Sequence, residues 1–241
     1  MQFKTMNGII KRRLLINYQL DPKIAVNLLP KPFSPKLIKG KAIIGVCLIR
    51  LEKVRPSLMS SIPFGISSEN AAHRMAVEWV EEDTIKEGVY IFRRDTNSKI
   101  NTVVGGRFFP GIHNYANIKV SELNERVEFS LASQDKEVEI YISGSQSEEM
   151  DQMSVFTSIN EISDFFKSGS DGYSPTQIEG CYQGLCLQTD DWNMSPFKVE
   201  KLKVTYLQNR LKIPSESLQF DSVVIMRNVH HKWKSLNDIS N

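Results

Sequence analysis

The chain has 241 residues, a net charge of +2, and hydrophobic and charged fractions of 41% and 24%, which are typical of a globular protein. Its densest basic run, residues 11–13, is far too short for the positive stripe of a nucleic-acid-binding surface. Residues 1–10 contain no apolar signal-peptide core, and the longest apolar run, residues 42–49, is much shorter than the roughly 20 residues of a membrane-spanning helix. We therefore expect a soluble cytoplasmic protein without nucleic-acid or membrane partners.

The three cysteines are an odd number, which argues against a disulfide framework and fits a reducing compartment. Cys47 lies in the apolar run and is expected in the core. Cys181 and Cys186 have no matching pair of Cys or His residues nearby, whereas zinc sites usually combine paired short spacings. The sequence also contains no phosphate-binding loop, dinucleotide fingerprint, nucleophile elbow or zinc-protease motif. We therefore predict no metal and no cofactor.

Apolar alternation, turn residues and helix caps divide the chain into short elements, most of them strands. Asp21 followed by Pro22 is a helix start, and Ser158 with Glu161 three residues later is a capping box. The predicted strands cover residues 9–20, 36–51, 66–79, 89–94, three segments within 112–145 and several within 176–229; the predicted helices cover 22–29, 96–109 and 158–166; later turns are predicted at 169–172, 180, 190–191, 195–196 and 214. We expect one mainly β domain over residues 1–241, chiefly antiparallel, with two or three short helices.

Ionisable residues inside apolar patterns gather around the predicted strand 66–79. Burying a charge costs several kcal/mol unless it is paired or used. Strand alternation places Glu69 and His73 on the more apolar face, about 13 Å apart, and Asn70 and Arg74 on the other face. A lone histidine on an apolar face is more often a core residue than a catalyst. Because Glu69 shares its face, we nevertheless interpret the pair as the best single lead to function.

Two further groups are candidates. Residues 93–95 (RRD) at a strand end are either a structural ion pair beside the next helix or part of a functional cluster. Gly105 and Gly106 weaken the helix predicted there, so we expect a strand or a ligand to pack closely on that backbone. His113 and Tyr115 share one face of the following strand. We expect both to face a cavity and bind a carboxylate or carbonyl oxygen, with outward packing of Tyr115 as the alternative.

Several motifs resemble those of known proteins. An uncharacterised domain-of-unknown-function family in the acetoacetate-decarboxylase-like superfamily is similar over nearly the whole chain, through residues 12–18 (RRLLINY), 67–74 (SSENAAHR), 93–96 (RRDT) and 105–111 (GGRFFPG). Acetoacetate decarboxylase itself is similar more remotely, through residues 17–22 (NYQLDP), 28–33 (LLPKPF), 106–107 (GR) and 111–115 (GIHNY).

The resemblance implies an antiparallel β-barrel or cone with a ligand cavity inside, and a small closed barrel can hold one small ligand. It also exposes departures from the decarboxylase. The two adjacent lysines of that enzyme, one of which forms the Schiff base, fall on Asn114 and Tyr115. The glutamate of its GRE motif falls on Phe108, and its N-terminal arginine falls on or beside Lys11. Schiff-base catalysis requires a desolvated amine, so we predict no imine chemistry.

Two hypotheses for function remain. The first is a protein that binds a small organic ligand without catalysis; the ligand is an apolar or aromatic molecule, or alternatively a carboxylate. The second is a lyase- or hydratase-type enzyme that acts on a small oxo acid without an imine, with an arginine holding the carboxylate and a histidine or Glu69 moving protons. We favour binding because no complete catalytic set can be named. The candidate ligand-binding residues are Glu69, His73, Arg94, Arg107, His113 and Tyr115.

Overall fold

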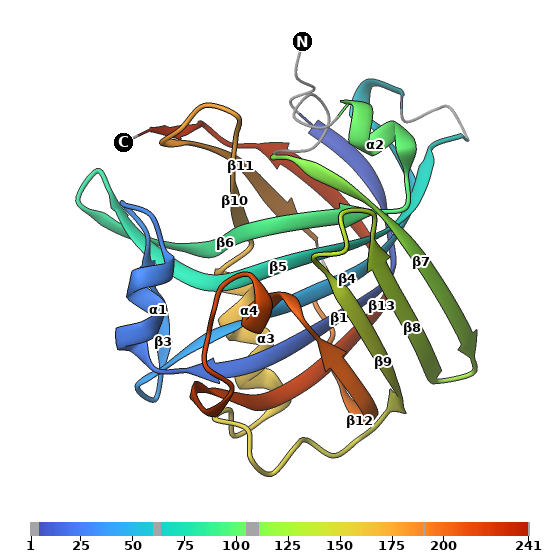
Figure 1. Ribbon diagram of the computed structural model, residues 1–241. Helices are drawn as coiled ribbons and strands as arrows, with labels where there is room; N and C mark the ends of the chain where they lie inside the picture. Colours follow the sequence, from blue (N-terminus) through green and yellow to red (C-terminus); the bar gives the residue numbers. More distant parts are fainter. Residues whose placement is uncertain (1–4, 60–63, 105–110, 190, 241) are drawn as a thin grey trace.

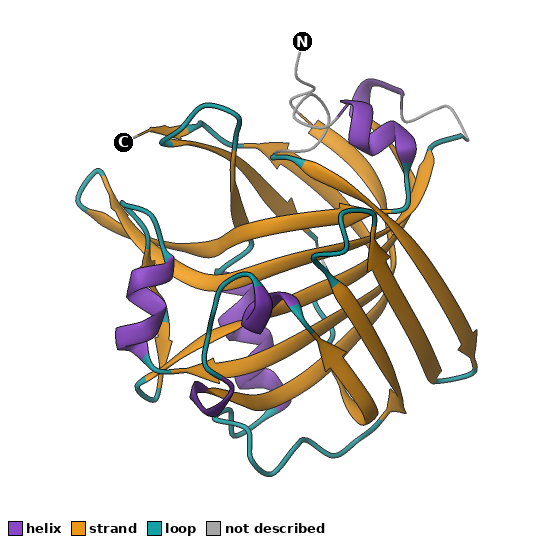
Figure 2. Ribbon diagram, in the orientation of Figure 1, coloured by secondary structure: helices purple, strands orange, loops and turns teal. Residues whose placement is uncertain are grey.

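β-Strands make up most of the computed structural model, which describes residues 5–59, 64–104, 111–189 and 191–240 (Figures 1 and 2). The strands are β1 (Thr5–Leu20), β2 (Ser34–Pro35), β3 (Leu37–Ile38), β4 (Lys41–Pro56), β5 (Ile66–Glu81), β6 (Thr84–Thr96), β7 (His113–Leu123), β8 (Arg126–Ser133), β9 (Glu139–Gln146), β10 (Asp171–Pro175), β11 (Cys181–Gln188), β12 (Ser195–Val204), β13 (Leu218–Ser235) and β14 (Ile239–Ser240). The helices are α1 (Pro22–Leu28), α2 (Lys99–Val104), α3 (Ile159–Ser168) and α4 (Tyr206–Asn209), with short 3-10 turns at Ser57–Met59 and Ser215–Ser217. The prediction of a mainly β fold is confirmed.

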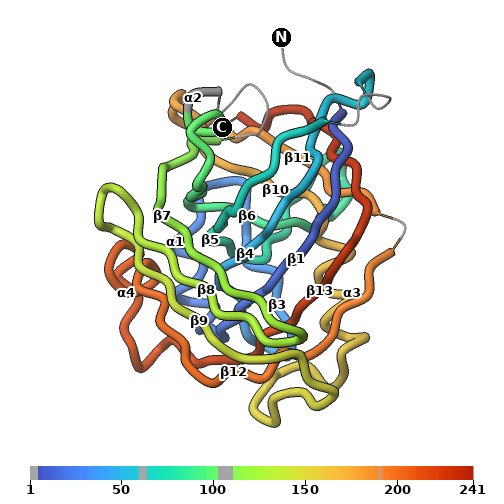
Figure 3. Tube along the Cα trace, turned by 90° about the vertical axis from the view of Figure 1, so that its right-hand side faces the viewer, coloured from blue at the N-terminus to red at the C-terminus, as the bar shows by residue number. Residues whose placement is uncertain are grey.

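The strands close into two rings that share five members. Backbone pairing runs from β5 through β6, β7, β8, β9, β12, β13, β1 and β4 back to β5, and we call this the nine-strand ring. β10 and β11 make a second closure, from β6 to β13, and form the seven-strand ring with β13, β1, β4, β5 and β6. The shared strands pass between α4 and α3 (Figure 3).

Each ring encloses its own apolar core, so the shared strands are covered on both faces. In β4, Ile44 and Val46 pack in the nine-strand ring, whereas Ile43 and Cys47 pack in the seven-strand ring. A strand buried on both faces needs apolar residues at consecutive positions, which explains the unbroken apolar run of β4. Complete burial of one such side chain contributes about 1.5–3 kcal/mol. Because its two faces are buried in different cores, β4 separates the core of the nine-strand ring from the core of the seven-strand ring.

The predicted helix caps are present. The Asp21 side chain accepts a hydrogen bond from the backbone N–H of Lys23 at the start of α1. The Ser158 hydroxyl accepts one from the backbone N–H of Glu161 at the start of α3, and the Glu161 carboxylate accepts one from Thr157. These bonds satisfy backbone donors that a helix start leaves without partners. No helix in the described parts of the chain is long and apolar enough to cross a membrane.

Most strand pairs are antiparallel, as expected, but two pairs are parallel, so the sheet is mixed and not strictly antiparallel. β6 runs parallel to β7, with Arg94 opposite His113, and parallel to β10, with Val89 opposite Gly172. Parallel neighbours need a crossover connection, and α2 with its flanking segments makes that connection between β6 and β7. The helix predicted over residues 96–109 is observed as the shorter α2. Its predicted continuation, including the two glycines, lies outside the described residues.

Two predicted turns are strand residues instead. Ser195 and Pro196 open β12 and pair with Ile225 and Val224 of β13, where they close the nine-strand ring. A proline is tolerated there because the start of a strand does not require its missing N–H. Gly172 lies in β10 and pairs with β6 and β11. Local composition predicts turns in both segments, but strand partners that are distant in sequence determine their conformation.

Candidate functional site

A cavity of about 120 Å³ lies inside the seven-strand ring, between the shared strands and the end of α3. An engineered protein cavity of about 150 Å³ admits benzene, so a ligand of about six non-hydrogen atoms fits this space. Its walls are largely apolar. They include Ile49, Leu51, Val89, Ile91, Leu185, Leu187 and Trp233, and the polar residues at the cavity are Arg13, Asn70, Arg74, Arg94, Asp95, Asn101, His113 and Ser170.

Three of the lining residues are arginines, each from a different shared strand. Arg13 comes from β1, Arg74 from β5 and Arg94 from β6. None of the three forms an ion pair with any carboxylate in the part of the chain that the structure describes. Asp95 also lines the cavity, but Arg93 binds its carboxylate. The cavity is therefore cationic, and its positive charge has no counter-ion from the described residues.

Arg74 is the most deeply buried of the three arginines, with 2% of its surface exposed. Its Nη2 donates a hydrogen bond to the Asn17 side chain at 3.0 Å, and its guanidinium lies 4.4 Å from the centre of the Phe166 ring. Its Nε and Nη1 have no hydrogen-bond partner among the described residues. Burial lowers the pKa of Arg74 to about 10. The side chain thus remains a cation at neutral pH and has donors left for an anion.

Arg94 and Arg13 bring two more guanidinium groups to the cavity. The Nε of Arg94 donates to the Ser174 hydroxyl at 3.1 Å, and burial lowers the pKa of Arg94 to about 10. The Nε of Arg13 donates to the Cys47 sulfur at 3.4 Å, and its guanidinium lies 5.3 Å from the Trp192 ring centre. These contacts fix the position of each side chain through its Nε. The other guanidinium nitrogens can then donate hydrogen bonds to a carboxylate.

Of the predicted site residues, Arg94 and His113 line the cavity and are brought together by the parallel pairing of β6 and β7. His113 also lines an adjoining surface groove beside Gly111 and Gln183. Tyr115 is half-buried in β7 and is not among the residues that line the cavity. Arg107 lies outside the described residues. The structure thus joins two of the six candidates at one cavity.

Glu69 and His73 face the nine-strand ring instead, on the opposite side of β5 from the cavity. Both are buried, as predicted, at 6% and 0% exposure. Glu69 pairs with Arg12 at 2.6 Å and, more distantly, with Arg50 at 3.8 Å. Burial raises the pKa of Glu69 although these arginines oppose the shift. Arg12 also contacts Glu122, so Glu69 belongs to a buried ion-pair network.

His73 stacks on Tyr206 of α4, with ring centres 4.4 Å apart. Its two ring nitrogens have no hydrogen-bond partner among the described residues. Burial, with a smaller contribution from nearby Arg93, lowers the pKa of His73 to about 3. At neutral pH the ring is therefore uncharged, and it packs as an aromatic core residue.

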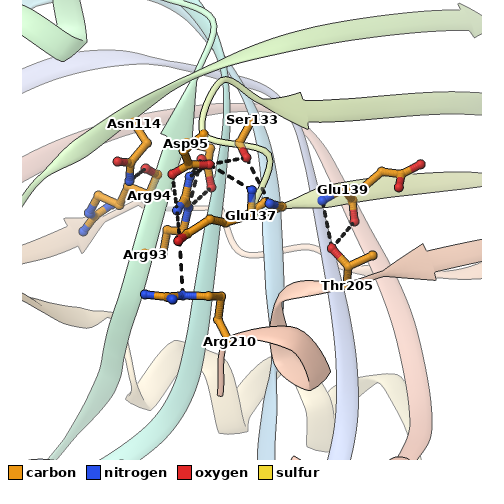
Figure 4. Close-up of polar contacts among 11 residues, drawn as sticks. Arg93, Arg94, Asp95, Asn114, Ser133, Glu137, Glu139, Thr205 and Arg210 are labelled. Carbon is orange, nitrogen blue, oxygen red and sulfur yellow. Dashed lines mark hydrogen bonds and ion pairs between the residues drawn. The ribbon is translucent and has the colours of Figure 1, made fainter. Parts of the chain in front are cut away.

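Arg93 and Asp95 form an ion pair. This matches the first of the two interpretations of residues 93–95, a structural ion pair, for these two residues. The Asp95 carboxylate accepts hydrogen bonds from Arg93 at 2.8–3.1 Å, and Asp135 and Glu137 from the β8–β9 turn also bind Arg93 (Figure 4). Burial acts to raise the pKa of Asp135, but hydrogen bonds from Arg93 and Ser133 lower it to about 2. Arg94 extends from the other side of β6, away from this network (Figure 4).

Residues that the sequence reasoning did not select complete the cavity. Arg13, Arg74 and Cys47 line it, and Asn101 has a buried side-chain oxygen without a partner among the described residues. Alternation along β5 had placed Arg74 with Asn70 on one face, and that face borders the cavity. None of the lysines that the structure describes lines this cavity. The described residues contain no cluster of three or more His, Cys, Asp or Glu side chains that could hold a metal ion.

Solved structures with a similar fold include acetoacetate decarboxylase, an acetoacetate decarboxylase-like enzyme and the biosynthetic enzyme MppR. Acetoacetate decarboxylase from Legionella pneumophila has a TM-score of 0.61 at 11% identity, covering 97% of this chain and 87% of that chain. An acetoacetate decarboxylase-like enzyme from Sphingomonas wittichii RW1 has a TM-score of 0.57 at 11% identity, covering 100% and 92%. The enduracididine biosynthesis enzyme MppR, complexed with pyruvate, has a TM-score of 0.53 at 10% identity, covering 98% and 89%. At these identities the likeness establishes the fold.

No curated protein matches this sequence. A family profile matches residues 10–223, which is most of the chain. The match includes the motifs at residues 12–18, 67–74, 93–96 and 105–111 that suggested a domain of unknown function, so that prediction is confirmed. The chain belongs to the DUF2071 family of uncharacterized conserved proteins, and its fold is acetoacetate-decarboxylase-like.

Proposed function

We propose that this protein binds a small carboxylate, with an oxo acid as the preferred class, in the cavity of the seven-strand ring and forms no imine with it. The observation that carries the proposal is the group of three arginines that line the cavity without a carboxylate partner among the described residues. A buried cation without a counter-ion is costly, and a bound anion would remove that cost. The apolar walls match the short carbon body of such an acid.

Further support comes from the size of the cavity and from one of the similar structures. A space of about 120 Å³ suits a ligand of about six non-hydrogen atoms, such as pyruvate. MppR, which has the same fold, was solved with pyruvate bound. No lysine from the described ranges lines this cavity, which argues against a Schiff base there.

Binding is favoured over lyase or hydratase catalysis by the placement of the acid–base groups. Glu69 and His73 face the nine-strand ring, so neither is placed to exchange a proton with a molecule in the cavity. His113 is the histidine at the cavity. General acid–base catalysis needs a group within hydrogen-bond reach of the reacting atom, and of the three candidate acid–base residues Glu69, His73 and His113, only His113 lines this cavity.

The test is calorimetric titration with pyruvate and with its neutral amide. We expect pyruvate to bind and the amide to bind at least tenfold more weakly. Replacing Arg94 by glutamine should weaken pyruvate binding by about 10- to 100-fold, because a hydrogen bond to a charged group contributes about 1.5–3 kcal/mol. Arg126→Gln is the matched control, because Arg126 lies on the exterior against Glu200 and should leave binding unchanged.

Sodium borohydride added to the protein with pyruvate or acetoacetate tests the second half of the proposal. An imine would be reduced to a stable amine, so we expect the intact mass to remain that of the free protein. A covalent adduct would contradict the proposed binding mode. Equal affinity for pyruvate and its amide would contradict the proposed anion site.

A further inference from the structure

Cys47 lines the cavity together with the three arginines. It is 6% exposed and packs in the core of the seven-strand ring. Its sulfur accepts a hydrogen bond from the Nε of Arg13 at 3.4 Å. A free cysteine in a core usually serves as a small apolar residue, but this sulfur borders a cavity that is large enough for a ligand.

The strand register aligns Cys47 with a guanidinium across the cavity wall. Cys47 of β4 lies opposite Ala72 of β5, and Ala72 lies opposite Arg94 of β6. Neighbouring strands are about 4.8 Å apart, so roughly 10 Å separates the backbone of Cys47 from that of Arg94. The small side chain of Ala72 leaves the space between them open. Arg74 follows Ala72 by two residues on the same face.

An independent observation points to a ligand site in this cavity. The Arg74 side chain is buried, it lines the cavity, and its Nε and Nη1 have no partner among the described residues. Buried donors in proteins nearly always have acceptors. An anion in this cavity would supply the missing acceptors, and the Cys47 side chain lines the same cavity.

We propose that Cys47 adds reversibly to the carbonyl carbon of an oxo acid held by these arginines, which makes the thiol the covalent group of the cavity. This inference rests on the proposed carboxylate site. The step forms a sulfur–carbon bond and breaks the carbonyl π bond, whose electron pair moves to the oxygen. The thiol proton ends on that oxygen, so the product is a hemithioketal and no oxidant or reductant takes part. Reversal restores the thiol and the oxo acid.

Competition between two alkylating reagents tests this placement in the wild-type protein. Iodoacetate and iodoacetamide carry the same leaving group and differ in charge. We expect Cys47 to prefer iodoacetate by about tenfold or more relative to Cys181, because an arginine–carboxylate contact contributes on the scale of a charged hydrogen bond. Cys181, half-buried in β11, is the internal control. Pyruvate should slow the alkylation of Cys47 alone, measured by peptide mass mapping.

Carbon-13 NMR with pyruvate labelled at its carbonyl carbon detects the adduct directly. We expect a protein-dependent resonance of a tetrahedral carbon bonded to sulfur, distinct from the hydrate seen without protein and absent in Cys47→Ala. If pyruvate binds in calorimetry but gives no such resonance, and Cys47 shows no preference for iodoacetate, the thiol proposal is overturned and the carboxylate site stands. If pyruvate does not bind, the carboxylate site fails and the thiol proposal fails with it. The alkylation assay needs no variant, so poor folding of Cys47→Ala does not block the test.

Discussion

The two rings share five strands, yet they surround buried arginines with different partners. In the nine-strand ring, Arg12 contacts Glu69 and Glu122, and Arg93 contacts Asp95 and two further carboxylates. In the seven-strand ring, the arginines at the cavity contact amide, hydroxyl, thiol and aromatic groups, and among the described residues they contact no carboxylate. A buried arginine that is paired with a carboxylate of the protein has a structural role. A buried arginine without such a counter-ion indicates a binding site for an anionic ligand.

The largest expected effect follows from breaking an ion pair in the nine-strand ring. Arg93→Met removes the partner of Asp95, whose side chain is fully buried. An uncompensated buried charge costs about 3–5 kcal/mol, and we expect the free energy of unfolding at pH 7 to fall by that amount in urea denaturation. Adding Asp95→Asn should recover part of the loss. A single variant as stable as the wild type would show that this network does not support the fold.

The second effect is a dependence of stability on pH that arises from His73. Its pKa falls from an ordinary 6.5 to about 3 in the folded protein. Between these values the unfolded state binds the extra proton, so the stabilisation by the neutral ring is complete above about pH 6.5 and is lost as the pH falls toward 3. From pH 7 to pH 4 the loss is on the order of 3 kcal/mol.

His73→Phe keeps an aromatic ring against Tyr206 and removes the titrating group. Unfolding in urea at pH 7 and pH 4 should therefore show a smaller loss of stability on acidification for the variant than for the wild type. His231, whose pKa burial lowers to about 4, gives the variant a remaining pH dependence. Equal losses in the two proteins would contradict the assignment of this dependence to His73.

Local signals in the sequence predicted the elements well. Alternation and turn residues located the β5–β6 hairpin and the three strands β7 to β9, and Asp21 and Ser158 marked two helix starts. The burial of Glu69 and His73 also followed from their positions in an apolar strand pattern. These features depend on neighbours in sequence, which is why sequence reasoning reached them.

The choice between the two faces of β5 could not be made from the sequence. Both faces are buried because β5 belongs to two rings, so apolar neighbours indicate a core on either side and do not tell which core holds a cavity. The parallel pairing of β6 with β10, which brings Ser174 to Arg94, joins segments about 80 residues apart and leaves no local signal. Strand alternation therefore places Arg74 on the correct face of β5, but it does not predict the contacts of Arg74 with Asn17 and Phe166.

The smallest effect on stability is expected for an arginine of the seven-strand ring. Replacing it by methionine repeats the Arg93→Met substitution in the other ring, so the two variants compare the rings directly. Arg74→Met removes a buried cation that has no counter-ion among the described residues. The change also deletes one hydrogen bond to Asn17 and a contact with the Phe166 ring, each a loss of about 1 kcal/mol. Removal of the unpaired charge offsets these losses. We therefore expect a free energy of unfolding between the wild-type value and about 1 kcal/mol above it, with pyruvate binding lost.

Arg93→Met and Arg74→Met should thus differ by about 3–6 kcal/mol in stability, although both exchange one buried arginine for methionine. Urea denaturation of the two variants measures that difference, and adding pyruvate to the wild type and to Arg74→Met separates the ligand from the fold. Saturation at about one hundred times the dissociation constant should stabilise the wild type by about 2.7 kcal/mol and leave Arg74→Met unchanged. If Arg74→Met is as unstable as Arg93→Met, the cavity arginine is structural, and the contrast between the rings does not identify a binding site.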